Sequence, residues 1–403
     1  MTNSDSRRPR GAKRTPANPT PDGAGPTPAG EMADASRGSE ITIEQRAVAG
    51  MSQGTIVRRR FFGHRAAVIS LVCFGLVVLL AFTSVGTVVG GDGGYRVHPE
   101  TGRLVIDGLR IPGWWDKDWW TRYDIVAGAA PTLQLWPFSF GEHPFGQDDL
   151  GKDMFARVMR GMQQSLLVVF LTGLISTAIG TVIGAVSGYY RGRVDQLLMR
   201  VTDVVIIIPL LVLGAVLART FGGNAVTIGV LLGALAWTGL ARLVRAEFLA
   251  LREREFVDAA RVAGASDARI IFKHILPNSV GVIVVNSTLL MSAAILIEVS
   301  LSFLGFGIQT PDISLGQLIN EYQGAFSTRP WLFWWPGIFI IVIALCINFV
   351  GDGLRDAFDP RQKHVPNFNG PMQELQRWWQ ARGADRTAPA LADGLADVAG
   401  EKR

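Results

Sequence analysis

Residues 66–89 read AAVISLVCFGLVVLLAFTSVGTVV and contain no charged side chain. A helix of this length is long enough to cross a hydrocarbon core of roughly 30 Å. Residues 331–350 form a second such run, and the two runs exclude a cytosolic or secreted globular domain. The whole chain of 403 residues agrees, because only 18% of it is charged, against about 25% in ordinary globular proteins. The sequence therefore predicts a membrane protein.

Apolar length predicts an all-α membrane protein with six spanning segments. The predicted segments are residues 66–89, 165–190, 201–219, 225–243, 279–304 and 331–350. Of the 39 Lys and Arg residues, 29 lie in the four stretches that these segments place on one side of the membrane, namely 1–65, 191–200, 242–277 and 351–403. The positive-inside rule makes that side cytoplasmic, so both termini are predicted to be cytoplasmic.

Composition divides the chain into five predicted regions. They are a disordered cytoplasmic tail at 1–57, the first spanning helix with its basic flank at 58–90, an extracytoplasmic segment at 91–160, a five-helix core at 161–350, and a cytoplasmic tail at 351–403. The outer segment contains a group of tryptophans, namely Trp114, Trp115, Trp119, Trp120 and Trp136. These suit either the membrane interface or the interior of a small outer domain.

Several familiar chemical sites are not predicted. Cys73 and Cys346 both lie in apolar runs, which leaves neither a disulfide framework nor a thiolate metal site. The histidines are scattered and match no metalloprotease spacing, so no metal site and no catalytic residue is expected. Basic residues flank the apolar runs, and we therefore attribute them to topology and expect no nucleic-acid partner.

A near match to a phosphate-binding loop stands at residues 146–153, reading GQDDLGKD. Asp153 replaces the Ser or Thr that should bind magnesium, and no buried strand precedes the loop, so nucleotide binding is not expected there. The acidic residues of the loop are instead expected to act as charges at the start of the second spanning helix. These residues are Asp148, Asp149 and Asp153.

Small residues recur every fourth position in two of the spanning segments. They are Ser176, Gly180, Gly184 and Gly188 in one segment and Gly229 and Gly233 in another. Faces of this kind let helices approach closely in lipid. They predict close helix packing, either within this chain or against a partner subunit.

Three polar residues lie within the spanning segments and are candidates for a translocation pathway. Glu298 is flanked by aliphatic residues, and an ionisable group in a spanning helix is a functional candidate by default. The alternative for Glu298 is a hydrated place near the outer interface. Asp203 is alternatively an interfacial residue or a partner for Arg200, and Asn286 alternatively bonds a neighbouring helix.

The loop between the fourth and fifth segments, residues 252–277, reads REREFVDAARVAGASDARIIFKHILP. It predicts two short helices separated at Gly264, which would take a left-handed conformation, with Ser266 capping the second helix. Phe256, Ala259, Ala260 and Ala263 are expected to share one apolar face of the first helix. Such a face can enter a groove on another protein, although a loop packed beneath its own bundle would show the same pattern.

This loop resembles the EAA loop of the permease subunits of bacterial ABC importers. The shared pattern is Asp258-Ala259-Ala260, then Gly264 after three residues, then Leu276-Pro277. Asp258 stands where relatives usually have Glu, and His274 where they usually have Ile. Residues 143–153, 300–307 and 351–360 are also similar to the C-type permease of the dipeptide, oligopeptide and nickel branch, so the resemblance covers roughly residues 61–361.

The resemblance implies an importer permease of type I, with six spanning helices and an outer insertion after the first. It implies that the chain forms half of a pathway for di- or oligopeptides in the plasma membrane of a bacterium and is not itself an enzyme. Partners would be a second homologous permease, two ATPase subunits that bind ATP and Mg, and an extracytoplasmic substrate-binding protein. The chain itself would bind no cofactor. The residues implied in ATPase coupling are Glu255, Phe256, Asp258, Ala259, Ala260, Ala263, Gly264, Ala265, Leu276 and Pro277.

Two other classes of function remain open from the residues. An ion-coupled transporter or channel is suggested by Glu298 and Asp203, although no internal repeat of the usual kind is visible. A membrane-bound enzyme using the outer segment has no catalytic constellation in its support. Relatives carry dipeptides, oligopeptides, nickel, glutathione or haem, and the sequence does not separate these substrates.

Overall fold

The computed structural model describes residues 53–89, 95–97, 104–106, 109–135 and 138–359. Most of both predicted tails, together with Trp136, lies outside the described residues. The helices are α2 Gln53–Gly63, α3 Arg65–Ser84, α4 Met154–Tyr190, α5 Gly192–Ile207, α6 Leu210–Phe221, α7 Ala225–Leu235, α8 Thr238–Arg252, α9 Glu255–Val262, α10 Asp267–Arg269, α11 Leu276–Phe303, α12 Leu315–Tyr322 and α13 Trp331–Phe358. Short turns η1 Ala127–Ala129 and η3 Gln323–Ala325 and the π-helix η2 Ile270–Ile275 complete the helical elements.

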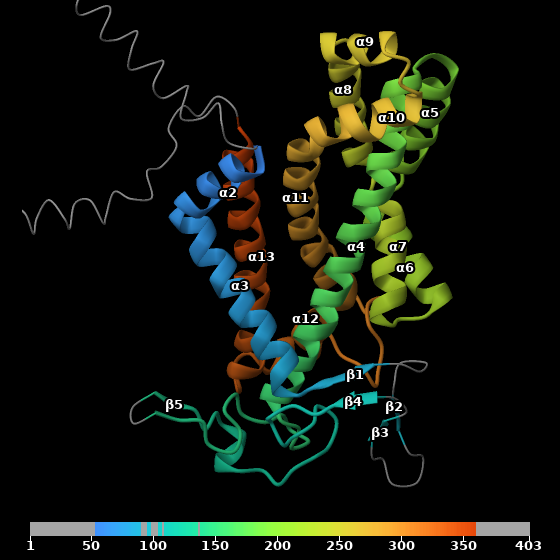
Figure 1. Cartoon of the computed structure of the whole chain (residues 1–403). Helices are drawn as coiled ribbons and strands as arrows, with labels where there is room; N and C mark the ends of the chain where they lie inside the picture. Colours follow the sequence, from blue (N-terminus) through green and yellow to red (C-terminus); the bar gives the residue numbers. More distant parts are fainter. Residues whose placement is uncertain (1–52, 90–94, 98–103, 107–108, 136–137, 360–403) are drawn as a thin grey trace, which may run out of the picture. The chain divides into compact units, whose positions relative to one another are not determined.

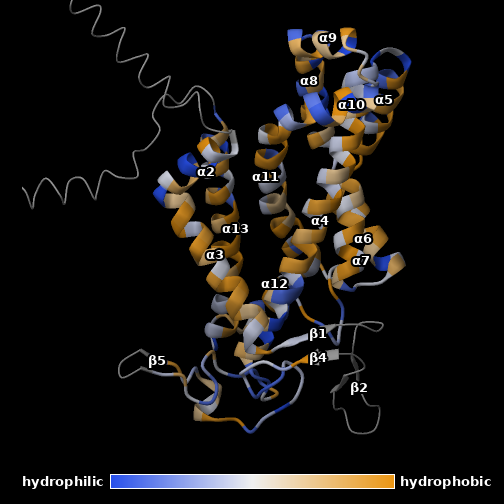
Figure 2. Ribbon diagram, in the orientation of Figure 1, coloured by the Kyte–Doolittle hydropathy of each residue, from blue (hydrophilic) through white to orange (hydrophobic). Residues whose placement is uncertain are grey.

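The prediction of a helical membrane protein with six spanning segments is confirmed. Among the described residues, four helical stretches are long and apolar enough to cross a membrane: α3, α4, the continuous stretch Asp267–Phe303, and α13. Two bent pairs, α5 with α6 and α7 with α8, bring the number to six if each pair is one span. Apolar residues cover the sides of these helices, and polar residues gather at their ends (Figure 2).

The third predicted segment is not one straight helix. α5 and α6 meet at an angle of 83°. Ile208 and Pro209 between them have extended backbone, with ψ of 123° and 117°. Proline has no N–H to continue the helical ladder and disfavours helical geometry in the residue before it, so α5 ends at Ile207. The fourth segment is bent by 43° between α7 and α8.

The outer segment adds strands that the all-helical prediction lacked. β1 Thr87–Val89 pairs antiparallel with β4 Leu109–Ile111, β2 Tyr95–Val97 with β3 Leu104–Ile106, and β5 Gln134–Leu135 with β6 Phe138–Ser139. Each ladder has two strands and is too short to change the helical class. Among the tryptophans, Trp119 is only 4% exposed and Trp114 is 53% exposed, so burial within the chain and an exposed position both occur.

α4 starts at Met154, eleven residues before the predicted span at 165. The Asp153 carboxylate caps it by accepting from the Ala156 N–H at 2.8 Å, which confirms the expected role of that residue. The added turns contain Arg157 and Arg160, which are 3% and 5% exposed. Hydropathy placed the boundary too late because both guanidinium groups are buried by carboxylate partners, which the sequence does not show.

α4 lies centrally, between the α3–α13 pair and the α7–α8 pair (Figure 1). Its small-residue face packs on α8 within the same chain: a Cβ at Gly184 would lie 2.5 Å from the Ala241 carbonyl oxygen. The second small-residue face, on α7, packs back on α4, where a Cβ at Gly229 would lie 2.8 Å from Leu171. Of the two interpretations of these faces, the structure supports packing within the chain.

Candidate coupling site

The loop between the fourth and fifth spans forms a compact turn between α9 and α10. Gly264 has φ of +78°, the left-handed conformation expected from the sequence. The Gly264 N–H donates to the Arg261 carbonyl at 2.9 Å, and the Ala265 N–H donates to the Ala260 carbonyl at 3.0 Å. This pair of bonds is the Schellman motif, which satisfies the last carbonyls of a helix. Ser266 stands at the cap position of α10, but its side chain makes no capping hydrogen bond, so that part of the prediction is wrong.

The two faces of α9 differ from the predicted arrangement. Val257 is fully buried, and Ala260 and Ala265 are half-buried against the same apolar cluster, which also contains Phe248 and Ile270. Ala260 therefore faces its own chain, because it lies three residues after Val257 and on the same side of the helix. The prediction that it belongs to the outward face is wrong.

The outward face of α9 is formed by Phe256, Ala259, Val262 and Ala263, all of them exposed. Val262 is 91% exposed, the largest value among the exposed large apolar side chains of the described residues. Val262 was not among the residues predicted from the sequence. Its exposure could have been predicted, because Val262 lies three residues after Ala259 and just before the turn at Gly264, where the last side chains of a helix project outward.

The loop is tied to the end of α4 by polar contacts. The Tyr189 hydroxyl donates to the Asp267 carboxylate at 2.7 Å, and Arg252 donates to the Tyr189 carbonyl at 2.6 Å. Arg191 forms an ion pair with Glu253 at 2.6 Å, just before the start of α9. The loop is thereby fixed to the C-terminal end of α4 on both sides of α9.

The transition from the loop to the fifth span is continuous rather than broken. The predicted loop ends at Pro277 and the fifth predicted span begins at residue 279, but residues 267–303 form one helical stretch with a π-helical turn, η2, inside it. The Leu276 N–H donates to the Ile271 carbonyl, five residues back, and the Asn278 side chain donates to the His274 carbonyl at 2.6 Å. The wider turn accommodates Pro277, which has no N–H to donate.

The three candidate pathway residues do not form one site. Asp203 pairs with Arg242 at 2.6 Å rather than with Arg200, and both side chains are 47% exposed. Asn286 donates to the Val282 carbonyl of its own helix at 2.7 Å rather than to a neighbouring helix. Since Asn286 and Glu298 are twelve positions apart on α11, they lie about 18 Å from each other along its axis.

Glu298 is fully buried, so the alternative of a hydrated place at the surface is wrong. Ser302 donates to its Oε1 at 2.8 Å, and the hydroxyls of Ser165 and Ser314 interact with the same carboxyl. These hydroxyls come from α11, α4 and the N-cap of α12. In this chain Glu298 therefore joins three helices, rather than lining an open path.

A buried polar network at the N-terminal end of α4 was not predicted. Arg157 contacts Asp148 at 3.1 Å and Glu321 at 2.6 Å, and the Tyr322 hydroxyl donates to Asp148 at 2.9 Å. The pKa of the Tyr322 phenol is raised, and the largest cause is its burial. The network holds α12 against α4, with Asp148 as a partner of both Arg157 and Tyr322. No group of three or more potential metal ligands occurs among the described residues.

Comparison with known proteins gives a consistent assignment. Residues 180–364 match the family described as binding-protein-dependent transport system inner membrane component. The chain is 42% identical to the oligopeptide transport system permease protein OppC of Mycobacterium tuberculosis H37Rv, over 78% of this chain and 97% of that protein. It is 36% identical to OppC of Haemophilus influenzae, over 80% and 93%, and 35% identical to OppC of Escherichia coli K12, over 79% and 95%.

Among solved structures, the chain is similar to one from the inward-facing MetNI methionine ABC transporter. The sequence identity is 20% and the TM-score 0.43, over 51% of this chain and 98% of the other. The assignment rests on the sequence relatives, which are matched over nearly their whole length. The chain belongs to the family of binding-protein-dependent transport system inner membrane components, as an OppC-like permease subunit of an ABC importer.

Proposed function

We propose that this chain forms half of the route by which an ATP-driven importer moves peptides into a bacterial cell. The proposal of a peptide substrate is supported by the names of its relatives, which are oligopeptide permeases. A second homologous permease would form the other half of the route. Both termini would be cytoplasmic, and an extracytoplasmic binding protein would deliver the peptide to the outer side.

The observation that supports this proposal is the outward face of α9, on a loop that polar contacts hold to the end of α4. Four apolar side chains stand exposed there, and no element among the described residues covers them: Phe256, Ala259, Val262 and Ala263. Apolar side chains on a short helix that ends in a Schellman motif fit a groove on a partner, and we propose that the partner is an ATPase subunit. Glu255 and Asp258 are exposed in the first turn of α9 and would flank that contact.

The chain contributes movement rather than chemistry in this proposal. Two ATPase subunits would bind ATP and Mg, and this chain would hold no cofactor. Closure of the ATPase pair would shift the docked α9 as a rigid body, and the fixed loop would pass the shift to α4 and α11. The near match to a phosphate loop at residues 146–153 has no part in this, because Asp148 and Asp153 are engaged in contacts within the chain.

The test is uptake by the complete transporter in proteoliposomes, with a radiolabelled tripeptide, the binding protein outside and ATP inside. We expect uptake that requires ATP and persists when ionophores remove the proton and sodium gradients. Uptake by this permease without ATPase subunits, driven by an ion gradient, would contradict the proposal and support an ion-coupled transporter.

A further inference from the structure

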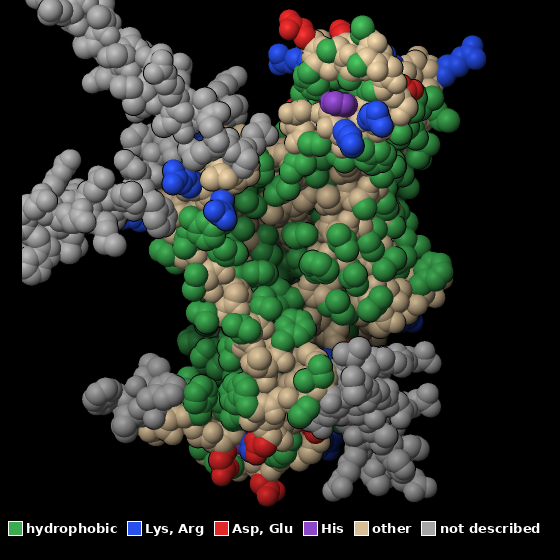
Figure 3. All heavy atoms as spheres, viewed as in Figure 1, with side chains coloured by type: hydrophobic (Ala, Val, Ile, Leu, Met, Phe, Trp, Pro, Cys, Tyr) green, Lys and Arg blue, Asp and Glu red, His purple; other side chains and the backbone are tan. Residues whose placement is uncertain are grey.

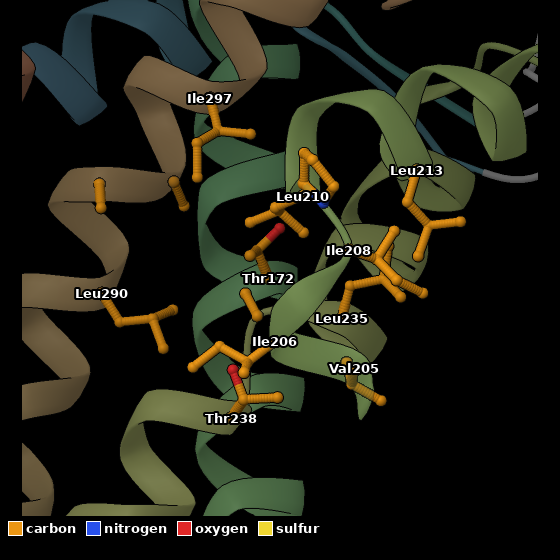
Figure 4. A pocket seen from close by; sticks show the side chains of 14 residues that line it. Thr172, Val205, Ile206, Ile208, Leu210, Leu213, Leu235, Thr238, Leu290 and Ile297 are labelled. Carbon is orange, nitrogen blue, oxygen red and sulfur yellow. The ribbon is translucent and has the colours of Figure 1, made fainter. Parts of the chain in front are cut away.

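A cavity of about 340 Å³ lies where the two bent spans meet α11 and α4 (Figure 4). We call it the break pocket. Its lining residues are Thr172 of α4; Val205, Ile206, Ile208, Pro209, Leu210 and Leu213 around the α5–α6 break; Leu235, Ala236 and Thr238 around the α7–α8 bend; and Leu290, Ala293, Ala294 and Ile297 of α11. The break between α5 and α6 and the bend between α7 and α8 therefore open into one cavity.

The non-helical backbone between α5 and α6 argues against a pocket that is filled by lipid. Backbone outside a helix at membrane depth is tolerated only where protein covers it or where it lines a water-containing cavity. Ile208 and Pro209 are extended, and α6 starts after Pro209 with no side chain to cap it. Ile206 and Ile208 are 44% and 43% exposed, so the described part of the chain does not cover this break. The cavity is therefore suited to a ligand with hydrogen-bonding groups of its own.

The side chains of the break pocket define which part of such a ligand would enter. The lining side chains include no charged residue, and all but two of them are apolar. Of those two, Thr172 already donates its hydroxyl to the Gly229 carbonyl at 3.2 Å, and Thr238 is 7% exposed. The volume falls in the usual range for ligand pockets, roughly 300–1,000 Å³. Its lining favours an uncharged apolar group.

We propose that the break pocket binds an apolar side chain of a peptide in transit, while the peptide backbone faces the extended residues Ile208 and Pro209 between α5 and α6. This inference rests on the proposed function. A peptide carries both features that the pocket presents, an apolar side chain and amide groups, whereas a lipid acyl chain carries only the first. The wall formed by Leu290, Ala293 and Ile297 belongs to the helical stretch that starts beside the coupling loop, so a shift of α9 would alter this pocket.

The first test fills the pocket by Ala293→Phe in the complete transporter. Ala293 is exposed on the pocket wall, and Ala178→Phe on α4 is the matched control, because Ala178 is also an exposed helical alanine but does not line the pocket. Uptake of the tripeptides Ala-Phe-Ala and Ala-Ser-Ala is compared with the same binding protein. We expect Ala293→Phe to lower the ratio of Ala-Phe-Ala to Ala-Ser-Ala uptake by about tenfold or more, and Ala178→Phe to leave it unchanged.

The second test measures contact directly, so that it does not depend on a variant that folds. A tripeptide with a benzophenone side chain is photolysed in the wild-type complex, and labelled residues are located by mass spectrometry. Labelling of residues 205–213 and 290–297 would support the proposal. Equal loss of both peptides in Ala293→Phe, or labelling of these residues by an acyl-chain photoprobe but not by the peptide, would overturn it. If the wild-type complex takes up neither peptide, the proposed function itself fails.

Discussion

Replacement of Val262 by Asp tests whether the outward face of α9 binds a partner or only packs within this chain. Val262 is 91% exposed, so the substitution removes almost no contact within this chain, and we expect the thermal unfolding temperature of the permease to change little. If a partner buries this side chain, its burial contributes about 1.5–3 kcal/mol, and a carboxylate in its place forfeits that amount. Since about 1.4 kcal/mol corresponds to a factor of ten, binding of the ATPase subunits should weaken by about 10- to 100-fold.

The assay is titration of the purified permease pair, held in nanodiscs, with labelled ATPase subunits, followed by peptide-stimulated ATP hydrolysis. Val262→Thr is the control, because threonine has nearly the size of valine and, unlike aspartate, carries no charge. This variant should retain most of the binding to the ATPase subunits. Val257→Asp is the opposite case, because Val257 is fully buried and its replacement should destabilise the permease itself. Wild-type binding and wild-type coupled hydrolysis in Val262→Asp would refute the assignment of α9 as the docking element.

Three further predictions concern the stability of the permease. Gly264→Ala forces a Cβ into a left-handed residue and should cost about 1–2 kcal/mol, seen as a lower unfolding temperature, while Gly264→Asn should cost less. Gly184→Ala should lower the unfolding temperature clearly, because its Cβ would lie 2.5 Å from a carbonyl oxygen of α8, whereas Gly239→Ala, with nothing within 4 Å, should not. Arg157→Leu leaves the buried Asp148 carboxylate without its cation and should cost about 3–5 kcal/mol in denaturant unfolding, whereas Asp149→Ala, at a 78% exposed side chain, should change little.

The sequence was sufficient for features that depend on local chemistry. Apolar length located six spanning segments, and the glycine at 264 located the end of α9, because a left-handed helix terminus favours a residue without Cβ. The four-residue spacing of small residues on α4 located a close helix contact. Each of these inferences needs only the properties of residues close together in the chain.

The features that were missed depend on partners far away in the sequence. The early start of α4 requires Glu321 and Asp312 to reach Arg157 and Arg160, more than 150 positions before them. A hydropathy pattern scores an arginine as an end of a span, whatever carboxylate neutralises it. Ala260 was misassigned for a similar reason, because the cluster that covers one side of α9 comes from α8 and the η2 turn.

The position of the π-helical turn gives the strongest link between the two ends of the mechanism. If Pro277 had ended the helix, the loop and the fifth span could move independently, and docking at α9 would not reach the pocket. Instead, the helix continues past the proline, because the Leu276 N–H forms a hydrogen bond with the Ile271 carbonyl. The Asn278 side chain forms a further hydrogen bond in the same turn. In the proposed mechanism, a movement of α9 would pass through the turn at Gly264 to the continuous stretch 267–303 and so reach Leu290 and Ala293. Coupling would therefore fail when this turn is loosened, even though it contacts neither an ATPase subunit nor a peptide.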